Sequence, residues 1–305
     1  MKETSTINSI IAEIRHRLEA VYSDPLLCEQ YAWWTVETIT GKDKATLLLH
    51  PDNILTPEQH HTLEQWLYKM IKEHEPIQYL IGSVPFGNVE IIVKSPTLIP
   101  RPETEEWTIK LIDQLKKLTN SKLTILDLCC GTGCIAIAIA KALPRAHIIA
   151  ADIAPHAVEL SKKNALHNNT PNVTVLQSDL FASMPSNMKF DLIVSNPPYI
   201  NPTDWASLDE SVTAWEDRQA LIADDHGLAI IEKIVMQAPN YLHPTSECLA
   251  ENIPQLMLEI DYNQGNAVRA LMESTYYTHV TIHKDLEGKD RVASGSLKDV
   301  AIAID

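Results

Sequence analysis

The stretch that decides the fold is TILDLCCGTGCIAIAIA, residues 124–140. Residues 123–128 predict a buried strand, and residues 134–143 predict a helix rich in alanine and isoleucine. Between them lies a tight turn of small residues. Gly131 and Gly133 would let its backbone approach a ligand more closely than any side chain would allow. This order favours the ligand-binding edge of a parallel sheet, beyond the carboxyl ends of its strands.

Strands and helices alternate from this stretch to the end of the chain. We expect further strands at 147–151, 173–177, 190–195, 256–260, 279–284 and 291–295, and helices at 155–168, 228–242 and 266–274. This alternation predicts a doubly wound α/β sheet that ends in an antiparallel hairpin.

The region before the sheet is predicted to be helical. Apolar residues recur at helical spacing from Ile7 to Val21, and Asp24-Pro25 and Thr56-Pro57 are signals for helix starts. After Pro76, strands at 79–86 and 89–93 around Gly87-Asn88 predict a hairpin. We therefore expect a helical domain at 1–74, a hairpin linker at 75–96 and the α/β domain at 97–305.

The composition narrows the class of protein. The net charge of −15 would repel phosphate backbones and argues against a dedicated nucleic-acid binder. We find no apolar stretch long enough for a membrane helix. Residues 1–5 are polar and lack the apolar core of a signal peptide. Three of the five cysteines lie within 129–134, which fits a reducing cytoplasm better than a disulfide framework.

The glycine turn predicts what kind of ligand is bound. The turn has neither the full G-x-G-x-x-G of a dinucleotide site nor the lysine of a P-loop. Asp152 ends the next strand, where a carboxylate can accept both hydroxyls of a ribose, and Asp127 could receive an ammonium group. An adenosine with an amino-acid tail, S-adenosylmethionine, fits these features best, although a plain packing turn is the alternative.

The cysteines around the turn invite two other interpretations. Cys129, Cys130 and Cys134 match no zinc-ligand spacing, so no metal site is expected. A catalytic thiol is not expected either, because no motif places a base nearby.

The stretch VSNPPYI, residues 194–200, ends a predicted buried strand on unusual residues. The Asn196 side-chain oxygen and the Pro197 carbonyl could accept both N–H bonds of a planar amide or amine. Pro198 would restrict that backbone, and Tyr199 could stack on the flat group. Such an arrangement suits methylation of a conjugated nitrogen, whose lone pair is a poor nucleophile. A rigid turn after a strand is the alternative.

Several motifs together resemble the HemK-type peptide chain release factor glutamine methyltransferases, the PrmC family. The resemblance covers about residues 75–297. It includes PIQYLIGSVPFG (76–87), LIPRPETE (98–105), LDLCCGTGCIAIAIA (126–140), AADI (150–153), FDLIVSNPPYI (190–200) and KDLEGKDRVASG (284–295). It implies a class I, Rossmann-like S-adenosylmethionine-dependent methyltransferase fold with a seven-stranded sheet, next to a small N-terminal helical bundle.

The resemblance also implies an activity. S-adenosylmethionine would methylate the amide nitrogen (N5) of the glutamine in the Gly-Gly-Gln motif of bacterial class I release factors, giving S-adenosylhomocysteine. The helical domain would help to recognise the release factor, and the enzyme is expected to be a cytoplasmic monomer without nucleic-acid or membrane partners.

Site residues carry over by position. The cofactor would contact Cys129, Cys130, Gly131, Thr132, Gly133, Asp152, Leu180 and Asn196; the glutamine would contact Asn196, Pro197, Pro198 and Tyr199, with Asn196 and Pro197 as the catalytic groups; and residues 101–104 would lie beside both.

This sequence departs from the family pattern in places. The first position of the cofactor turn is Cys129, and Leu180 replaces a frequent aromatic residue. The loop 220–228 lacks two central glycines and an aspartate, the family's EIG reads EID at 259–261, and the segment 243–255 is longer. These changes concern the substrate side more than the cofactor side.

Two other functions use similar features. An adenine-N6 DNA or RNA methyltransferase needs the same acceptor chemistry, but it normally also needs a basic surface. A binding module without activity would have no need of an intact Gly131, Gly133, Asp152 and Asn196.

Overall fold

The computed structural model describes residues 6–51, 55–118 and 122–298, so the polar residues 1–5 lie outside the described residues. The chain divides into two compact units. One comprises Met1–Gly82 and Asp209–Trp215, and the other comprises Ser83–Leu208 and Glu216–Asp305. The bounds 1–74, 75–96 and 97–305 stay a prediction. No helix in the described ranges has the length and apolar composition to span a bilayer.

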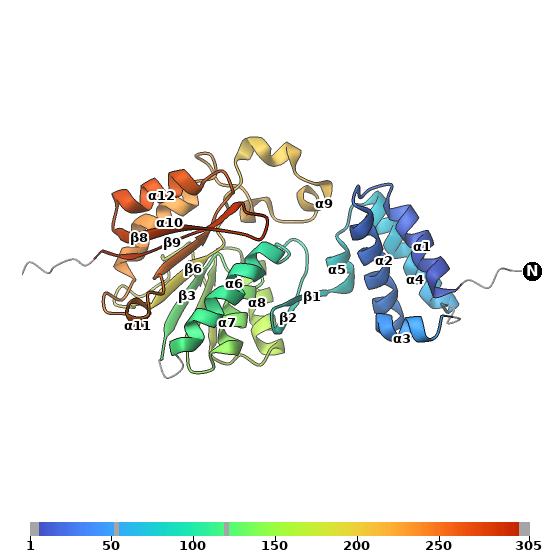
Figure 1. Cartoon of the computed structure of the whole chain (residues 1–305), viewed down its shortest axis with the longest axis horizontal. Helices are drawn as coiled ribbons and strands as arrows, with labels where there is room; N and C mark the ends of the chain where they lie inside the picture. Colours follow the sequence, from blue (N-terminus) through green and yellow to red (C-terminus); the bar gives the residue numbers. More distant parts are fainter. Residues whose placement is uncertain (1–5, 52–54, 119–121, 299–305) are drawn as a thin grey trace, which may run out of the picture. The chain divides into compact units, whose positions relative to one another are not determined.

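The first unit is a bundle of helices around its own apolar core (Figure 1). Its helices are α1 (Ile7–Leu18), α2 (Pro25–Thr40), α3 (Lys44–Leu49), α4 (Pro57–Lys72), α5 (Ile77–Ile81) and the short α9 (Glu210–Thr213). Thr56 and Gln59 form the capping box that begins α4, and Gly41 ends α2 in a left-handed conformation. The segment 209–215 is held by a bond from Trp215 Nε1 to the Glu73 carbonyl, 2.7 Å long.

The prediction of a strand from residue 79 is wrong for its first residues, 79–81. Residues Ile77–Ile81 form helix α5, and strand β1 covers only Ser83–Phe86 before pairing with β2 (Val89–Ile92). Gly82 causes the difference, because its left-handed φ of 89° ends the helical turn and its N–H bonds to the Gln78 carbonyl.

The second unit contains the predicted seven-stranded sheet, in the order β5-β4-β3-β6-β7-β9-β8. The first five strands in this order are parallel, and β9 and β8 form the expected antiparallel end. Their bounds are β3 (Thr124–Leu128), β4 (His147–Asp152), β5 (Val173–Gln177), β6 (Leu192–Ser195), β7 (Leu256–Glu259), β8 (Tyr277–Lys284) and β9 (Asp290–Leu297).

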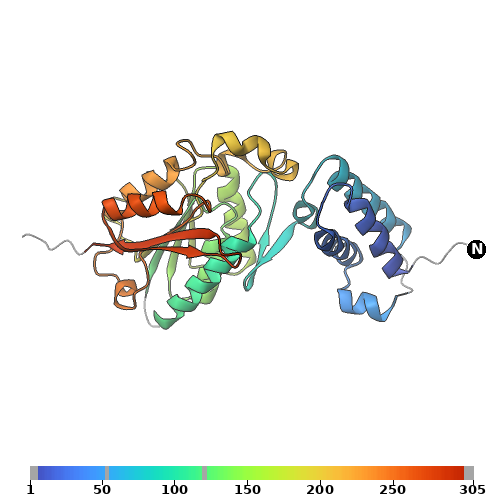
Figure 2. The same cartoon turned by 45° about the horizontal axis from the view of Figure 1, so that its top comes forward.

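Helices cover both faces of this sheet. Figures 1 and 2 show α6, α7 and α8 on one face and α10 and α12 on the other. Their bounds are α6 (Pro102–Leu115), α7 (Cys134–Ala142), α8 (Pro155–His167), α10 (Ala229–Gln237) and α12 (Gly265–Ser274). The segment 243–255 carries the one-turn helix α11 (Glu247–Ala250). Short 3₁₀ turns cover Lys116–Leu118, Pro202–Ser207, Arg218–Ala220 and Ala238–Asn240.

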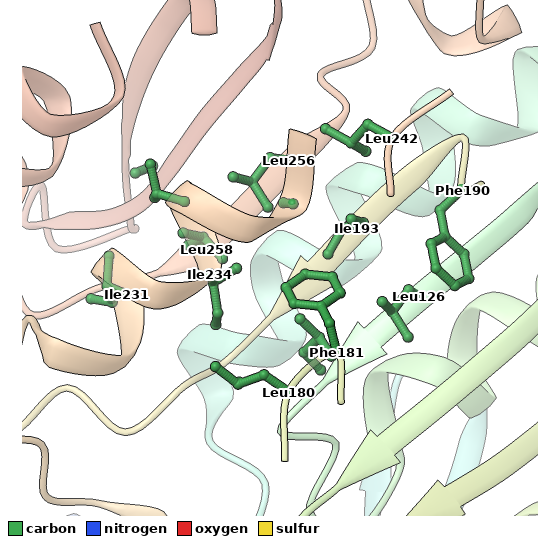
Figure 3. Close-up of a cluster of buried hydrophobic side chains, with 14 of the residues drawn as sticks. Leu126, Leu180, Phe181, Phe190, Ile193, Ile231, Ile234, Leu242, Leu256 and Leu258 are labelled. Carbon is green, nitrogen blue, oxygen red and sulfur yellow. The ribbon is translucent and has the colours of Figure 1, made fainter. Parts of the chain in front are cut away.

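The core under α10 fixes the middle of the sheet. In Figure 3, Leu126 of β3 and Ile193 of β6 lie with Phe181 opposite Ile231 and Ile234 of α10. Every one of these side chains is at least 98% buried. At about 25 cal/mol per Å² of apolar surface removed from water, such packing is the main force that holds the strands in register.

Asn164 ties the β1–β2 hairpin to the glycine turn. Its Oδ1 accepts the Ile92 N–H at 2.7 Å, and its Nδ2 donates to the carbonyls of Ile92 and Thr132, both at 2.9 Å. The side chain is fully buried on α8, so water cannot replace these bonds.

We predict that Asn164→Ala lowers the free energy of unfolding by about 2–4 kcal/mol, because three backbone groups lose their partner and one of them, the Thr132 carbonyl, is buried. Denaturant unfolding followed by circular dichroism measures the change. The neighbouring exposed Lys163 provides the matched control, and Lys163→Ala should change stability by less than about 0.5 kcal/mol. Equal effects of the two substitutions would contradict this role of Asn164.

Candidate active site

A cavity of about 210 Å³ opens at the carboxyl ends of the parallel strands. The strand register brings its parts together, because Leu128 of β3 pairs with both Ala151 of β4 and Ser195 of β6. The residues that follow each strand therefore meet at one edge. Of the residues predicted from sequence, the following line the cavity: Cys129, Gly131, Asp152, Leu180, Asn196 and Pro198.

The glycine turn forms one wall. Gly131 has a φ of 54°, and a Cβ built on it would meet no atom within 4 Å, so at this lining position a side chain would take up open space. Gly133 begins α7 with a φ of 80°, and its Cβ would lie 2.3 Å from Ser161 Oγ, so glycine is needed there for packing. The other residues of the turn do not line the cavity: Cys130, Thr132 and Gly133 lie on the side of the turn away from it.

Asp152 stands at the end of β4 with both oxygens engaged by backbone. Oδ2 accepts the Gly131 N–H at 2.9 Å, and Oδ1 accepts the Ala154 N–H at 2.9 Å. Burial raises the pKa of this carboxyl, and these two N–H groups partly offset the rise. Each oxygen has further lone-pair capacity, so the carboxylate can accept two more donors from the cavity.

Asp127 does not belong to the cavity, so the suggestion that it receives an ammonium group is not supported. It is fully buried at the end of β3, where Oδ2 accepts the Ala136 N–H of α7 at 3.1 Å. Burial raises its pKa to about 8. Asp127 thus binds the beginning of α7, as a carboxyl group does at a helix N-terminus.

The cysteines of the turn have the properties of uncharged thiols. Cys130 and Cys134 are buried, and Cys129 is half-buried in the wall of the cavity. Burial raises the pKa values of Cys129 and Cys130 above their usual range, and that of Cys134 to about 12. A thiol of this kind is neither a good nucleophile nor a ready metal ligand. Among the described residues, no three His, Cys, Asp or Glu side chains are grouped to hold a metal ion.

The Asn-Pro-Pro-Tyr segment follows β6 directly. Ser195 Oγ donates to the Leu128 carbonyl at 2.7 Å and fixes the end of the strand. Asn196 Nδ2 lies 3.2 Å from Thr104 Oγ1, and Pro197 is buried. Tyr199 does not line the cavity; its hydroxyl lies 3.2 Å from Glu259 Oε1 and its carbonyl accepts a bond from Gln264 Nε2 at 2.9 Å.

Two buried carboxylates were missed as site residues by the sequence reasoning. Glu259 at the end of β7 accepts hydrogen bonds from Thr104 and Trp107, and burial raises its pKa. Glu216 bonds Arg101 at 2.5 Å and the Ile99 N–H at 3.3 Å, so it anchors the PRPETE segment. Glu259 could have been predicted from the sequence, because it is a polar residue that ends a buried strand at the edge of the sheet that carries the site. Glu216 lies in a loop, and no sequence pattern marks it as a site residue.

The altered loop 220–228 packs against the Asn-Pro-Pro-Tyr segment. Ala223 and Asp224 stand where the family pattern has glycines, and neither has a positive φ, so the backbone does not need glycine there. Gly227 does have one, with a φ of 85°, and its Cβ would lie 2.0 Å from the Tyr199 carbonyl oxygen. Gly227 therefore allows this loop to pack against the segment.

The cavity suits an adenosine with an amino-acid tail. It offers an acceptor carboxylate at Asp152, open space beside the backbone of Gly131, and apolar surface from Leu180, Ile222 and Ile230. Among the described residues, its lining contains no lysine or arginine, so a phosphate group would find neither of the side chains that most often bind it. These properties fit S-adenosylmethionine and disfavour a nucleotide.

Comparisons with known proteins agree with this fold. Residues 103–212 match the model of the Methyltransferase small domain, and residues 9–82 match that of the PrmC N-terminal domain. The fold and these matches define an S-adenosylmethionine-dependent methyltransferase.

The curated relatives narrow this class to a family. The release factor glutamine methyltransferase of Salmonella typhimurium is 38% identical over 261 residues, which are 85% of this chain and 89% of the relative. That of Flavobacterium psychrophilum is 34% identical over 270 residues, 87% and 90% of the two chains. The chain therefore belongs to the release factor glutamine methyltransferase family.

A solved structure supports the fold alone. The catalytic domain of hMettl16, in complex with MAT2A 3'UTR hairpin 6, has a TM-score of 0.51 and 14% sequence identity. The match covers 80% of this chain and 84% of that chain.

We predict that Gly227→Ala disturbs the Asn-Pro-Pro-Tyr segment, because the new Cβ would collide with the Tyr199 carbonyl. Methyl transfer should fall by more than about tenfold, because a displacement of about 1 Å at a reacting centre can cost that much or more. A steady-state methyl-transfer assay with a release factor as the methyl acceptor measures the loss of activity.

Gly288→Ala is the matched control. Gly288 has a similar φ of 79°, but a Cβ there would meet nothing within 4 Å. Both variants carry the strain of a left-handed alanine, about 1–2 kcal/mol, yet only Gly227→Ala should lose activity. Equal activities would contradict the packing role of Gly227.

Proposed function

We propose that this chain transfers a methyl group from S-adenosylmethionine to the side-chain amide nitrogen (N5) of the glutamine in the Gly-Gly-Gln motif of class I peptide chain release factors. The observation that supports this most is the position of Asn196 and Pro197. They follow β6 at the edge where the cavity opens, and Asn196 lines that cavity.

The substrate side depends on two fixed acceptors. An amide nitrogen delocalises its lone pair into the carbonyl group and is a weak nucleophile. Asn196 Oδ1 and the Pro197 carbonyl would accept its two N–H bonds, which directs the lone pair toward the cavity. Both oxygens also stabilise the positive charge that grows on the nitrogen during transfer. Pro197 and Pro198 keep the backbone from turning that carbonyl away.

The cofactor side would be held by the turn and the two strand ends next to it. S-adenosylmethionine supplies a methyl group activated by a positively charged sulfur. In our proposal, Asp152 accepts the ribose hydroxyls, Leu180 lies against the adenine, and residues 129–133 surround the methionine part, with Gly131 in direct contact. Asn196 borders both ligands because it lines the cavity and carries the substrate acceptor.

The proposed partner and compartment follow from the family. Release factors act on ribosomes, so we place the enzyme in the cytoplasm, where its five free cysteines would stay reduced. We propose that the PrmC N-terminal domain region, 9–82, contributes to release-factor recognition. We expect a monomer without nucleic-acid or membrane partners.

The direct test is methyl transfer from radiolabelled S-adenosylmethionine to a purified class I release factor. A release factor whose Gly-Gly-Gln glutamine is replaced by alanine, and duplex DNA containing adenine, serve as the competing acceptors. We expect label only in the intact release factor. Label in DNA, or in the glutamine-free factor, would overturn the proposal in favour of an adenine-N6 enzyme or another protein site.

We predict that Asn196→Ala lowers methyl transfer by about 10²–10³-fold, because one preorganised contact to the transition state is lost. Calorimetry should show that S-adenosylmethionine still binds. Turnover at the wild-type rate would remove Asn196 from the catalytic role.

We predict that affinity for S-adenosylmethionine depends on pH through Asp152. The carboxylate is the form that accepts ribose hydroxyls. Affinity should therefore be constant above its pKa in the free protein and fall as the pH drops through it. Because burial raises this pKa from 3.8, the fall should begin at a higher pH than for an exposed aspartate.

Asp152→Asn is the comparison variant. It should bind more weakly at neutral pH and lose this part of the pH dependence, as measured by calorimetry at several pH values, with circular dichroism showing that the fold persists. An identical pH profile in both proteins would exclude Asp152 as the titrating group.

A further inference from the structure

We propose that Glu259, acting through Thr104, sets the orientation of the Asn196 side-chain amide, so that its oxygen and not its nitrogen faces the substrate. This inference rests on the proposed function, because it assigns the groups that position the acceptor of the substrate N–H. Glu259 and Thr104 are positioning residues in this scheme, since neither lines the cavity.

The three residues form a chain of hydrogen bonds that is buried at Glu259 and part-buried at Asn196. Thr104 lies in the first turn of α6. Its Oγ1 is 2.7 Å from Glu259 Oε2 and 3.2 Å from Asn196 Nδ2. Glu259 is 1% exposed and Thr104 is 2% exposed. Water therefore has little access, and each bond must be made within the protein.

The direction of each bond follows from the groups themselves. Trp107 Nε1, at 2.8 Å from Glu259 Oε2, can only donate, so Oε2 is an acceptor. Thr104 has one hydroxyl hydrogen, and it is used on the same oxygen at 2.7 Å. Toward Asn196, Thr104 Oγ1 can then only accept.

Asn196 must consequently turn its NH₂ group to Thr104. Its Oδ1 is then left for the substrate, which is the orientation that accepting an N–H requires. The conclusion holds whether or not Glu259 carries a proton on Oε1, because Oε2 receives both donors in either state. With Oε2 unprotonated, the amide orientation is thus set by the available donors and acceptors and not only by the shape of the site.

The same carboxylate also binds the far end of the segment. Tyr199 Oη lies 3.2 Å from Glu259 Oε1, so the two oxygens of Glu259 hold the residues that flank Pro197 and Pro198. Gln264 Nε2 adds a bond to the Tyr199 carbonyl at 2.9 Å. Glu259 therefore connects α6, β7 and both ends of Asn-Pro-Pro-Tyr.

A purely structural role for Thr104 is the competing explanation. Thr104→Val keeps the shape but removes the hydroxyl, so the Asn196 amide can turn over. We expect kcat with the release factor to fall by about tenfold, the scale of one buried hydrogen bond. Tm should fall as well, because Glu259 loses a buried donor, while affinity for S-adenosylmethionine should stay nearly unchanged. Thr104→Ser restores the hydroxyl and should recover most of kcat.

Thr108→Val is the matched control. Thr108 is also a fully buried threonine on α6, one turn later, and its hydroxyl donates only to the Thr104 carbonyl at 2.7 Å. It should lose similar stability but keep kcat. A wild-type kcat in Thr104→Val, or an equal loss of kcat in Thr108→Val, would overturn the positioning role.

A second measurement keeps this test separate from the identity of the substrate. The side-chain NH₂ signals of Asn196 in an NMR spectrum report its bond to Thr104 without any substrate. We expect them to shift in Thr104→Val and to stay in place in Thr108→Val. Unchanged signals in Thr104→Val would refute the positioning proposal, whereas failure of the wild type to methylate release factors would refute only the proposed function.

Discussion

The constraint on which the site depends is the parallel pairing of β3 with β6. Leu128 and Ser195 are partners at the ends of these strands, so Cys129 and Asn196 begin their turns side by side. The cofactor turn and the substrate acceptors are more than sixty residues apart in sequence, and this single register joins them. A slip of one residue would turn each following side chain to the opposite face and separate the two halves of the site.

Buried polar groups then fix what the register brings together. Asp152 holds Gly131, Glu216 holds Arg101, and Glu259 holds Thr104. A buried carboxylate without donors would be costly, and each of these has at least two. These hydrogen bonds position the site edge without any ligand, which suits a reaction that depends on the orientation of a poor nucleophile.

Much of this arrangement could be predicted from the sequence, because its signals are local. The strand–glycine–helix pattern at 124–140 predicted the sheet and the position of the turn, and the alternation that follows predicted the antiparallel end. The prediction was wrong at residues 79–81, where the residues suit a strand and a short helix equally and Gly82 decides between them.

What could not be predicted depends on distant residues. Asp127 lies one residue before the end of β3 and Asp152 ends β4, yet only Asp152 lines the cavity, because Asp127 is buried against α7. The link from Glu259 to Asn196 joins three separate elements, and no spacing in the sequence reveals it. The absence of glycine at Ala223 and Asp224 departs from the family pattern, but neither residue has a positive φ, so the backbone does not need glycine at these two positions.

The most direct test of the central claim is a crystal structure of the protein with S-adenosylhomocysteine and a release-factor peptide that contains Gly-Gly-Gln. We predict that the glutamine side-chain nitrogen lies within hydrogen-bonding distance of both Asn196 Oδ1 and the Pro197 carbonyl, while Asn196 Nδ2 stays on Thr104 Oγ1. A glutamine bound away from Asn196, or an Asn196 that presents its nitrogen to the substrate, would contradict the claim.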